Sequence, residues 1–582
     1  MTPDESPNVR RLLLITAFAG SLFFAGLGTP GLHDPDESRY AEIAREMLES
    51  GNFVVPHLNY VPYLDKPPLT YWTTCLALKV FGLNEFAVRF VPALSGLLCV
   101  IAVYLFGCAM VGEGAAFRSA IVLSTSALFF ALSRTLVTDM VLTLFVTLAV
   151  GFLYLSWERG PRWLIPAYIS LALGALTKGP VAVLLPVMPV GFLMLKKKGT
   201  PGLTSLVSIG AIAAFLAVWL PWHVAIWYAR PEFYTHFFLT ENLGGFFRKG
   251  IHHSHPAYYT VYYLALGFVP WTLFLPATIW GIFSRCDHRR DTVMLCLAWA
   301  GTIILLFSLS VSKLPTYILP ALPPLALIVG VAIPDRGAPC LAVRIATALI
   351  GMAFCVSLAV AMAFLAPLAL GMTAEVRTLC VIFMGIVVVL SIALTRSAGK
   401  LSFVLGGSIL PFVLVSIILT HSPQLLEYRS PRVIASAILE RGDAVDVACF
   451  GQQHPNLCFY MRRRQILVDR VPRIYRLGLS IQPENDGFLS SRKFMDKVNT
   501  HVGIYCIVRD VDLVLFEERF GPHFRFVSVF PYDHLEYLFV SRAMSADHAP
   551  QANPLPDWGL CDLLDAYGLR TDVEHRERTP SL

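Results

Sequence analysis

The chain has 582 residues, of which 55% are hydrophobic and only 15% are charged. An average soluble domain carries about 25% charged residues, so this composition excludes both an ordinary water-soluble globule and a disordered chain. The net charge of +6 is small and the basic residues are dispersed, so charge gives no support for nucleic-acid binding. The composition is typical of a protein that crosses a membrane many times.

Uncharged apolar runs recur along the first 426 residues, most of them near the 20 residues that cross a bilayer as a helix. Because the first run lacks a small-residue cleavage site, we expect it to stay in the protein as a helix. The runs predict about thirteen transmembrane helices, at residues 12–32, 90–112, 119–133, 140–157, 163–177, 179–195, 199–229, 256–284, 292–312, 314–334, 345–374, 378–395 and 401–426.

Lysine and arginine are concentrated in alternate loops, and such loops stay on the cytoplasmic side of a membrane. This rule predicts that the N-terminus is inside and that the region after the last span is outside. The loops assigned to the cytoplasm contain Arg10 and Arg11, Arg118, Arg159 and Arg162, Lys196 to Lys198, Arg285, Arg289 and Arg290, Arg336 and Arg344, and Arg396 and Lys400.

The opposite loops hold few charges, and those few occur in unusual local sequences. The same topology places all of them at the outer face, so we expect them to form one polar cavity. They include Asp36, Glu37 and Arg39 in the first outer loop, Asp65 and Lys66 before two prolines, Arg134, Asp139, Lys178, Glu241, Arg248, and Lys313 with Tyr317 close behind it.

Several of these residues also have a structural interpretation. Asp36 and Glu37 could simply begin an amphipathic helix over residues 36–50, because acidic residues stabilise a first helical turn. Asp139 could cap a helix, and Lys178 could extend to the membrane surface. His252, His253 and His255 could bind a metal, although an interfacial position fits them better.

From residue 427 the composition changes, and charged residues return. Short apolar runs at 445–450, 502–508, 526–530 and 537–540 alternate with predicted helices near 431–441, 454–463 and 511–519. This pattern predicts a small α/β domain outside the membrane, followed by a polar tail. Its cysteines, Cys449, Cys458, Cys506 and Cys561, could form a disulfide in an oxidising compartment. There is no zinc-type Cys/His spacing and no phosphate-binding glycine loop, so use of ATP is not expected.

Four sequence motifs resemble those of the GT-C glycosyltransferases. Residues 34–42 read Asp-Pro-Asp-Glu-Ser-Arg-Tyr-Ala-Glu and residues 65–72 read Asp-Lys-Pro-Pro-Leu-Thr-Tyr-Trp. Leu-Thr-Lys-Gly-Pro follows at 176–180 and Lys-Leu-Pro-Thr-Tyr-Ile-Leu-Pro at 313–320. The set is similar to the aminoarabinose:lipid A transferases within the protein-mannosyltransferase-like superfamily. The resemblance implies a GT-C membrane fold of about thirteen helices with a C-terminal α/β domain.

The resemblance also implies roles for the outer-face residues. Asp36, Glu37 and Asp139 match the family's catalytic acids, and Arg39, Lys66, Lys178 and Lys313 would bind the donor phosphate. Asp65, Tyr317, Glu241 and Arg248 would support them. Asp65 stands where relatives have glutamate, and Glu241-Asn242 stands where they have Glu-His. Use of a divalent metal therefore stays open.

The reaction implied is an inverting transfer of aminoarabinose from undecaprenyl phosphate to lipid A at the periplasmic face of a bacterial inner membrane. An alternative is a hexose transferase that acts on protein or polysaccharide with the same kind of donor. A transporter of lipid-linked substrates is disfavoured, because it would need charges within the spans or inverted repeats.

Overall fold

The computed structural model describes residues 6–196, 203–247, 255–275, 290–332, 432–440, 446–483, 485–500, 503–531 and 535–541. The predicted spans at 345–374, 378–395 and 401–426 lie outside these residues. So do Cys561, Arg248, His252 and His253, and the predicted polar tail.

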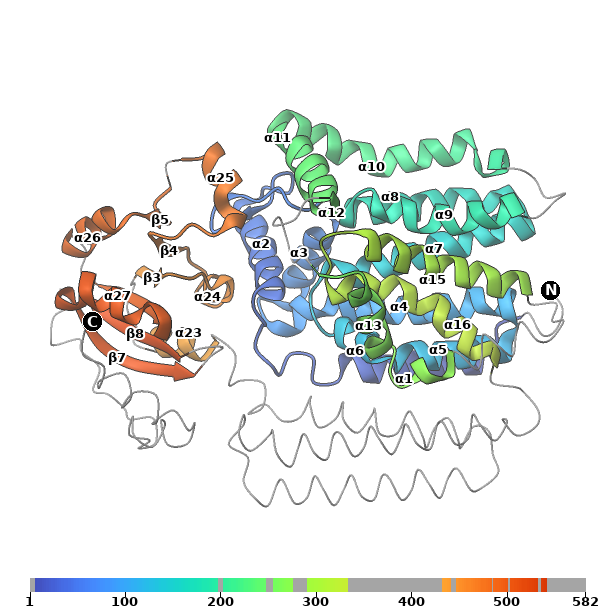
Figure 1. Cartoon of the computed structure of the whole chain (residues 1–582), viewed down its shortest axis with the longest axis horizontal. Helices are drawn as coiled ribbons and strands as arrows, with labels where there is room; N and C mark the ends of the chain where they lie inside the picture. The colour runs from blue at the N-terminus through green and yellow to red at the C-terminus, as the bar shows by residue number, and fades with distance from the viewer. Residues whose placement is uncertain are drawn as a thin grey trace, which may run out of the picture.

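Most of the predicted apolar runs form helices that pack side by side (Figure 1). Asparagine side chains cap two of these helices, since Asn8 accepts from Arg10 and Arg11 before α1 and Asn84 accepts from Ala87 before α4. The helices are α1 (Val9–Phe24), α4 (Glu85–Val111), α5 (Glu113–Ser124), α6 (Ala127–Ser133), α7 (Thr138–Arg159), α8 (Leu164–Lys178), α9 (Val181–Lys196), α10 (Ile209–Ala229), α13 (Tyr258–Gly267), α15 (Arg290–Leu309) and α16 (Leu322–Ala332).

Four of the described helices, α4, α7, α10 and α15, are long and apolar enough to cross a membrane. The run predicted as one span at 119–133 is instead a bent pair, because α5 and α6 meet at 67°. The first helix ends at Phe24 rather than at residue 32, and the run at 314–334 begins as a 3-10 helix, η5 (Pro315–Ala321). Proline at positions 315 and 320 is compatible with that tighter start.

The segment after α1 forms a compact outer layer at one end of the helices. It contains α2 (Asp36–Ser50), the hairpin β1 (His57–Leu58) and β2 (Val61–Pro62), and α3 (Leu69–Phe81). Gly51 ends α2 in the left-handed conformation that glycine adopts without strain. The predicted amphipathic helix at 36–50 is therefore present with the predicted bounds.

The C-terminal region forms a six-stranded mixed sheet with the strand order β5-β4-β3-β6-β8-β7. β3, β4, β5 and β6 run parallel, β8 pairs antiparallel with β6, and β7 pairs antiparallel with β8. The strands are β3 (Asp446–Phe450), β4 (Gln465–Val468), β5 (Phe488–Leu489), β6 (Ile504–Arg509), β7 (Phe524–Pro531) and β8 (Leu535–Ser541). The helices are α23 (Arg432–Leu439), α24 (Pro455–Met461), α25 (Arg476–Ile481), α26 (Ser491–Thr500) and α27 (Asp510–Phe520).

Three cysteines of this region, Cys449, Cys458 and Cys506, are buried free thiols. A disulfide among these three is therefore absent from the described residues. Each thiol fills a position in the hydrophobic interior of the sheet and its helices, as free cysteine commonly does.

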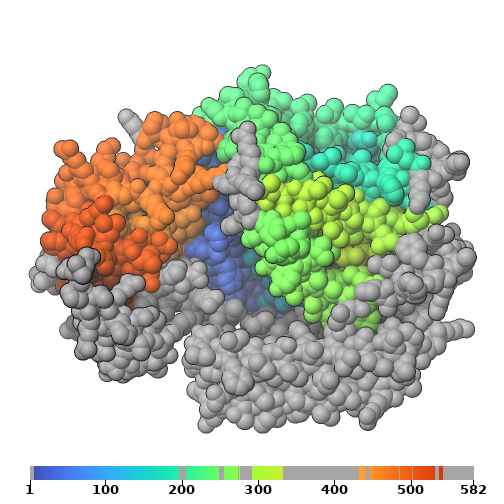
Figure 2. All heavy atoms as spheres, in the orientation of Figure 1, coloured from blue at the N-terminus to red at the C-terminus, as the bar shows by residue number. Residues whose placement is uncertain are grey.

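The C-terminal sheet packs directly on the outer layer. One buried cluster joins Ile43 and Met47 of α2 to Leu457, Leu467 and Tyr505 of the C-terminal region. In Figure 1 this region lies at the opposite end of the molecule from the N-terminus, with α2 and α3 beside it. Figure 2 shows the blue N-terminal segment deep between the orange C-terminal region and the green helices. The segment that carries the motifs at 34–42 and 65–72 thus lies between the C-terminal region and the other helices.

Candidate functional site

The first turn of α2 exposes one carboxylate, that of Asp36, to solvent. Arg39 donates a hydrogen bond and forms an ion pair with Asp36 one turn earlier, and the Asp36 side chain remains 43% exposed. The guanidinium carbon of Arg39 lies 5.2 Å from the ring centre of Tyr40 and 5.9 Å from that of Tyr63. These rings hold the arginine in place by cation–π attraction, so Asp36 keeps a fixed counter-charge and an accessible carboxylate.

Glu37, the next residue, is in a wholly different environment. Its carboxylate accepts two hydrogen bonds of 2.8 Å from Arg89 of α4 and others from the backbone N–H groups of His33 and Leu136. Both side chains of the pair are at most 2% exposed. Burial by itself would raise the pKa of Glu37, but the charge and hydrogen bonds of Arg89 outweigh it and lower that pKa. Glu37 therefore fixes the start of α2 against α4 and against the segment that leads into α7.

Asp139 and Lys178 come together because α7 and α8 form an antiparallel pair. Asp139 is in the first turn of α7 and Lys178 is the last residue of α8, and Nζ lies 2.5 Å from Oδ1. The ammonium also lies 4.3 Å from the ring centre of Tyr317 in η5. The same hairpin places Arg159 and Arg162 at the opposite ends of the two helices, in agreement with the predicted alternation of the loops.

Lys66 is the cation of this site that lacks a partner within the described part of the chain. It is half-buried, and no hydrogen bond or ion pair forms to its ammonium among those residues. Its positive charge and that of Lys178 repel each other. Two ammonium groups that repel each other, one of them unpaired, make a place where an anion binds favourably.

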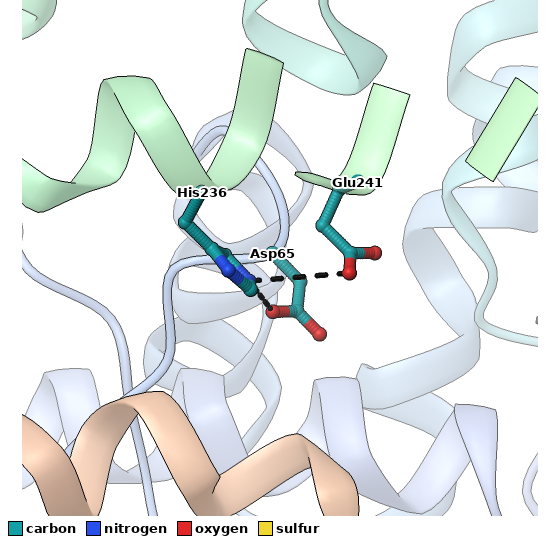
Figure 3. A group of neighbouring side chains, drawn as sticks. All are labelled: Asp65, His236 and Glu241. Carbon is teal, nitrogen blue, oxygen red and sulfur yellow. Dashed lines mark hydrogen bonds and ion pairs between the residues drawn. The ribbon is translucent and has the colours of Figure 1, made fainter. Parts of the chain in front are cut away.

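A second group of titratable side chains, formed by Asp65, His236 and Glu241, lies near Lys66 and Lys178. Gly179, directly after Lys178, has φ of +78°, and a Cβ there would come within 2.5 Å of the Phe237 ring. Glycine thus allows the π-helix η3 (Thr235–Gly244) to approach the end of α8 closely. His236 of η3 contacts Asp65 at 2.7 Å, and its Nε2 is 4.0 Å from Glu241 (Figure 3).

The donor atoms of Asp65, His236 and Glu241 all lie within 4.8 Å of one another. Figure 3 shows the three side chains converging from the loop before α3 and from η3. One imidazole and two carboxylates are ligands that Zn²⁺ accepts, and three protein ligands leave a coordination position open. The residues present therefore fit a divalent metal.

The structure also places Lys313 and His255. Lys313 is 3% exposed, and its ammonium donates to the carbonyl oxygens of His255, at 3.0 Å, and of Ser310. The His255 ring stacks on Tyr259 with 4.0 Å between ring centres. Arg248 belongs to the residues that the structure does not describe.

Sequence reasoning missed His236 and Arg89. His236 precedes Glu241 by five residues, a spacing that an ordinary α-helix does not bring to one face but a π-helix does. Nothing in the local sequence announces that π-helix. Arg89 directly precedes the apolar run at 90–112, and its partner Glu37 is 52 residues away.

Comparison with known proteins agrees with these motifs. Residues 65–227 match the family described as dolichyl-phosphate-mannose-protein mannosyltransferase. The chain is 32% identical over 363 residues to an undecaprenyl phosphate-alpha-4-amino-4-deoxy-L-arabinose arabinosyl transferase of Erwinia tasmaniensis, a match over 60% of this chain and 64% of that protein. A protein of the same description from Yersinia enterocolitica is 32% identical over 323 residues, 54% of this chain and 58% of that protein. The matches span about three fifths of these relatives' own length.

The described helices and the C-terminal sheet have the architecture of the GT-C membrane fold. Within that class, the chain shares its fold with the crystal structure of ArnT from Cupriavidus metallidurans bound to undecaprenyl phosphate. The TM-score is 0.77 at 21% sequence identity, over 93% of this chain and 99% of that one. The resemblance predicted from the sequence motifs is thereby confirmed.

Proposed function

We propose that the chain is an integral membrane glycosyltransferase that moves aminoarabinose from undecaprenyl phosphate to lipid A at the outer face of a bacterial inner membrane. The names of its 32% identical relatives and the shared fold with ArnT support this proposal. Its partners would be the lipid-linked donor, a lipid A acceptor and the bilayer.

The observation that carries the proposal is the pair Lys66 and Lys178. Lys66 has no counter-ion among the described residues, while Lys178 is already paired with Asp139. A half-buried ammonium needs an anion to offset the loss of its hydration. The phosphate of the lipid-linked donor provides that anion at the depth where the sugar bond must break.

The reaction that fits is a one-step displacement. An acceptor oxygen forms a bond to the anomeric carbon while the bond from that carbon to the donor phosphate oxygen breaks, and the electron pair leaves with undecaprenyl phosphate. Lys66 and Lys178 stabilise the charge that develops on the leaving oxygens. Attack from the opposite side inverts the anomeric configuration.

Asp36 would act on the acceptor. If the acceptor atom is a hydroxyl oxygen, Asp36 removes its proton as a general base. If the acceptor is a phosphate of lipid A, that oxygen is already ionised, and Asp36 with Arg39 orients it instead. The 43% exposure of the Asp36 side chain leaves room for either contact.

The other acidic and basic residues would hold these groups in position. Glu37 would position the first turn of α2 through Arg89, rather than contact substrate itself. Asp139 would hold the ammonium of Lys178. Lys313 would bind the donor phosphate more weakly than Lys66, because backbone carbonyls already accept its hydrogen bonds. Arg248 and Tyr317 stay candidates for support of the donor.

Asp65, His236 and Glu241 would hold a divalent metal, with His236 taking the place of the histidine absent at position 242. A bound metal would supply positive charge near the donor phosphate as a Lewis acid. In its absence, the Asp65–His236 bond keeps the loop that carries Lys66 against η3.

The orientation and the domain division belong to the same proposal. We expect about thirteen helices in residues 1–426 and a periplasmic α/β domain in residues 427–582. A reporter joined after residue 440 should report the periplasm, and one at Lys197 should report the cytoplasm. A cytoplasmic signal after residue 440 would put the site on the wrong face and reject the proposal.

A second candidate rests on the family match over residues 65–227. A hexose from a polyprenyl phosphate donor could be transferred to protein or polysaccharide by the same site. Mass spectrometry of lipid A from cells with and without this chain separates the two. The proposal predicts lipid A that gains aminoarabinose only when the chain is present, and unchanged lipid A would reject it.

A further inference from the structure

The hydroxyl of Tyr71 is buried without a hydrogen-bond partner in the described part of the chain. Tyr71 lies in the first turn of α3 and is 0% exposed. Its hydroxyl oxygen finds no donor or acceptor among those residues. Buried polar groups in proteins are nearly always paired, so an unpaired one points to a partner that binds there.

The surroundings of this hydroxyl are the acidic and basic groups of the site. The ring of Tyr71 lies 5.9 Å from that of Tyr40, and Arg39, Asp65 and Asp36 all act electrostatically on the hydroxyl. Nε of Arg39 is also buried and lacks a partner among the described residues. Tyr71 and Arg39 thus each carry one unused donor, an O–H and an N–H, among the charged residues of the site.

The chemistry of these donors selects one kind of ligand atom. A guanidinium N–H can only donate, and a phenol donates readily to an oxygen acceptor. An oxygen of a phosphate or of a sugar hydroxyl satisfies both groups, whereas an apolar lipid chain satisfies neither. The donor phosphate already has Lys66 and Lys178, so the acceptor is the substrate that can supply this oxygen.

We propose that Tyr71 and Nε of Arg39 form a subsite that binds an oxygen of the acceptor and holds the nucleophile beside Asp36. The inference rests on the proposed function and adds residues that the sequence motifs did not assign. Tyr40 and Tyr63 enclose the subsite, since their rings pack on Arg39.

Replacement of Tyr71 by phenylalanine tests the subsite directly, because it deletes the hydroxyl and keeps the ring. In vesicles with purified protein, we expect kcat/KM for the acceptor to fall about tenfold, the scale of one hydrogen bond to substrate. The KM for the donor should not change. The thermal midpoint should stay the same or rise, because an unpaired buried group is removed.

Tyr104→Phe is the matched control. Its hydroxyl donates to Glu113 at 2.8 Å and accepts from the backbone N–H of Asn8, at the other end of α4. This variant should lose thermal stability and keep transfer per folded molecule. The two tyrosines therefore predict opposite results.

Transfer by Tyr71→Phe at the wild-type rate would overturn the inference, as would a loss of activity that only follows a loss of thermal stability. An equal rise in the KM for the donor would place the hydroxyl at the wrong substrate and would also overturn it. If the wild-type protein transfers no sugar, the proposed function fails; if it transfers and Tyr71→Phe does too, only the subsite fails.

Discussion

Two polar regions lie along α2, and they differ in how completely their groups are bonded. The first turn carries Asp36, whose carboxylate is 43% exposed and pairs with Arg39 alone among the bonds described here. Farther along the helix, Arg45 donates to both oxygens of Glu42, to Glu49 and to Tyr60. The Asp36 carboxylate in the first region can therefore accept further hydrogen bonds, whereas Arg45 in the second region already donates several.

The second region joins α2 and its hairpin to the C-terminal sheet. The Asn59 side chain donates to the carbonyl oxygen of Gln465 and accepts from its N–H, each at 3.0 Å, as a neighbouring strand would. Asn59 is 0% exposed. Buried, hydrogen-bonded groups such as Arg45 and Asn59 stabilise one arrangement, whereas the exposed carboxylate of Asp36 can still bind a ligand. Polarity alone does not distinguish a site from a scaffold.

The largest effect should follow the loss of the buried acid Glu37. Glu37→Gln leaves Arg89 charged, buried and short of its counter-ion, which costs about 3–5 kcal/mol in comparable pairs. Thermal unfolding of the purified protein in detergent measures this loss. Glu49→Gln is the control on the same helix, since that side chain is 50% exposed and should change stability by under about 1 kcal/mol. Equal stability of the two variants would show that the Glu37–Arg89 pair does not stabilise the fold.

Asp36→Asn should give the next largest effect, on catalysis and not on folding. The change keeps the size of the side chain and removes its charge. We expect transfer to fall by roughly two orders of magnitude, about 2.7 kcal/mol, as for the loss of a general base. Glu49→Gln should transfer normally. Sugar transfer by Asp36→Asn near the wild-type rate would show that Asp36 only stabilises the first turn of α2.

Lys66→Ala should have a smaller effect, which is confined to the binding of the lipid-linked sugar donor. Loss of one ammonium contact to a phosphate predicts a KM for the donor that rises about tenfold or more. Lys79→Ala is the control, because Lys79 is exposed in the last turn of α3, the helix that follows Lys66 in the chain. Membrane abundance is measured alongside to exclude loss of protein. The same KM in both variants would remove Lys66 from the donor site.

The smallest effect concerns pH and the scaffold region. Burial, followed by the neighbouring charge of Glu42, raises the pKa of Glu46 well above its ordinary value. The groups that face it are Glu42 and Arg45 on α2, Tyr60 of the hairpin, and Cys458 and Tyr475 of the C-terminal region. The folded protein therefore holds a proton that the unfolded chain releases above the ordinary glutamic pKa.

Stability should then decrease as the pH rises above that ordinary value, by at most about 1.4 kcal/mol per pH unit for one proton. Glu46→Gln imitates the protonated acid and should flatten this dependence. Thermal midpoints recorded across that pH range give the slope for both proteins. Equal slopes would show that folding does not raise the pKa of Glu46.

The sequence predicted those parts of the fold that depend on local pattern. Runs of apolar residues located α4, α7 and α15, and alternation of loops brought Asp139 and Lys178 to the same end of their helices. The break between α5 and α6 was missed, because serine and threonine at 124–126 do not interrupt a hydropathy pattern. Strands β4 and β5 were missed as well, since they are only four and two residues long.

Side-chain partners were the least predictable feature. Asp65 meets His236 across 171 residues, and Asn59 meets Gln465 across 406. No local pattern encodes such pairs, because helix packing and sheet docking create them. Lys313 illustrates the same limit, since its predicted role depended on charge while its actual partners are backbone carbonyls.

Transfer by the purified protein tests the central claim most directly. The wild-type chain in vesicles is supplied with undecaprenyl phosphate-aminoarabinose and lipid A, and the products are identified by mass spectrometry and NMR. The account predicts one undecaprenyl phosphate released for each sugar that appears on lipid A, with the anomeric configuration inverted, and almost no product from Asp36→Asn. Retained configuration, or transfer that Asp36→Asn sustains at the wild-type rate, would contradict it.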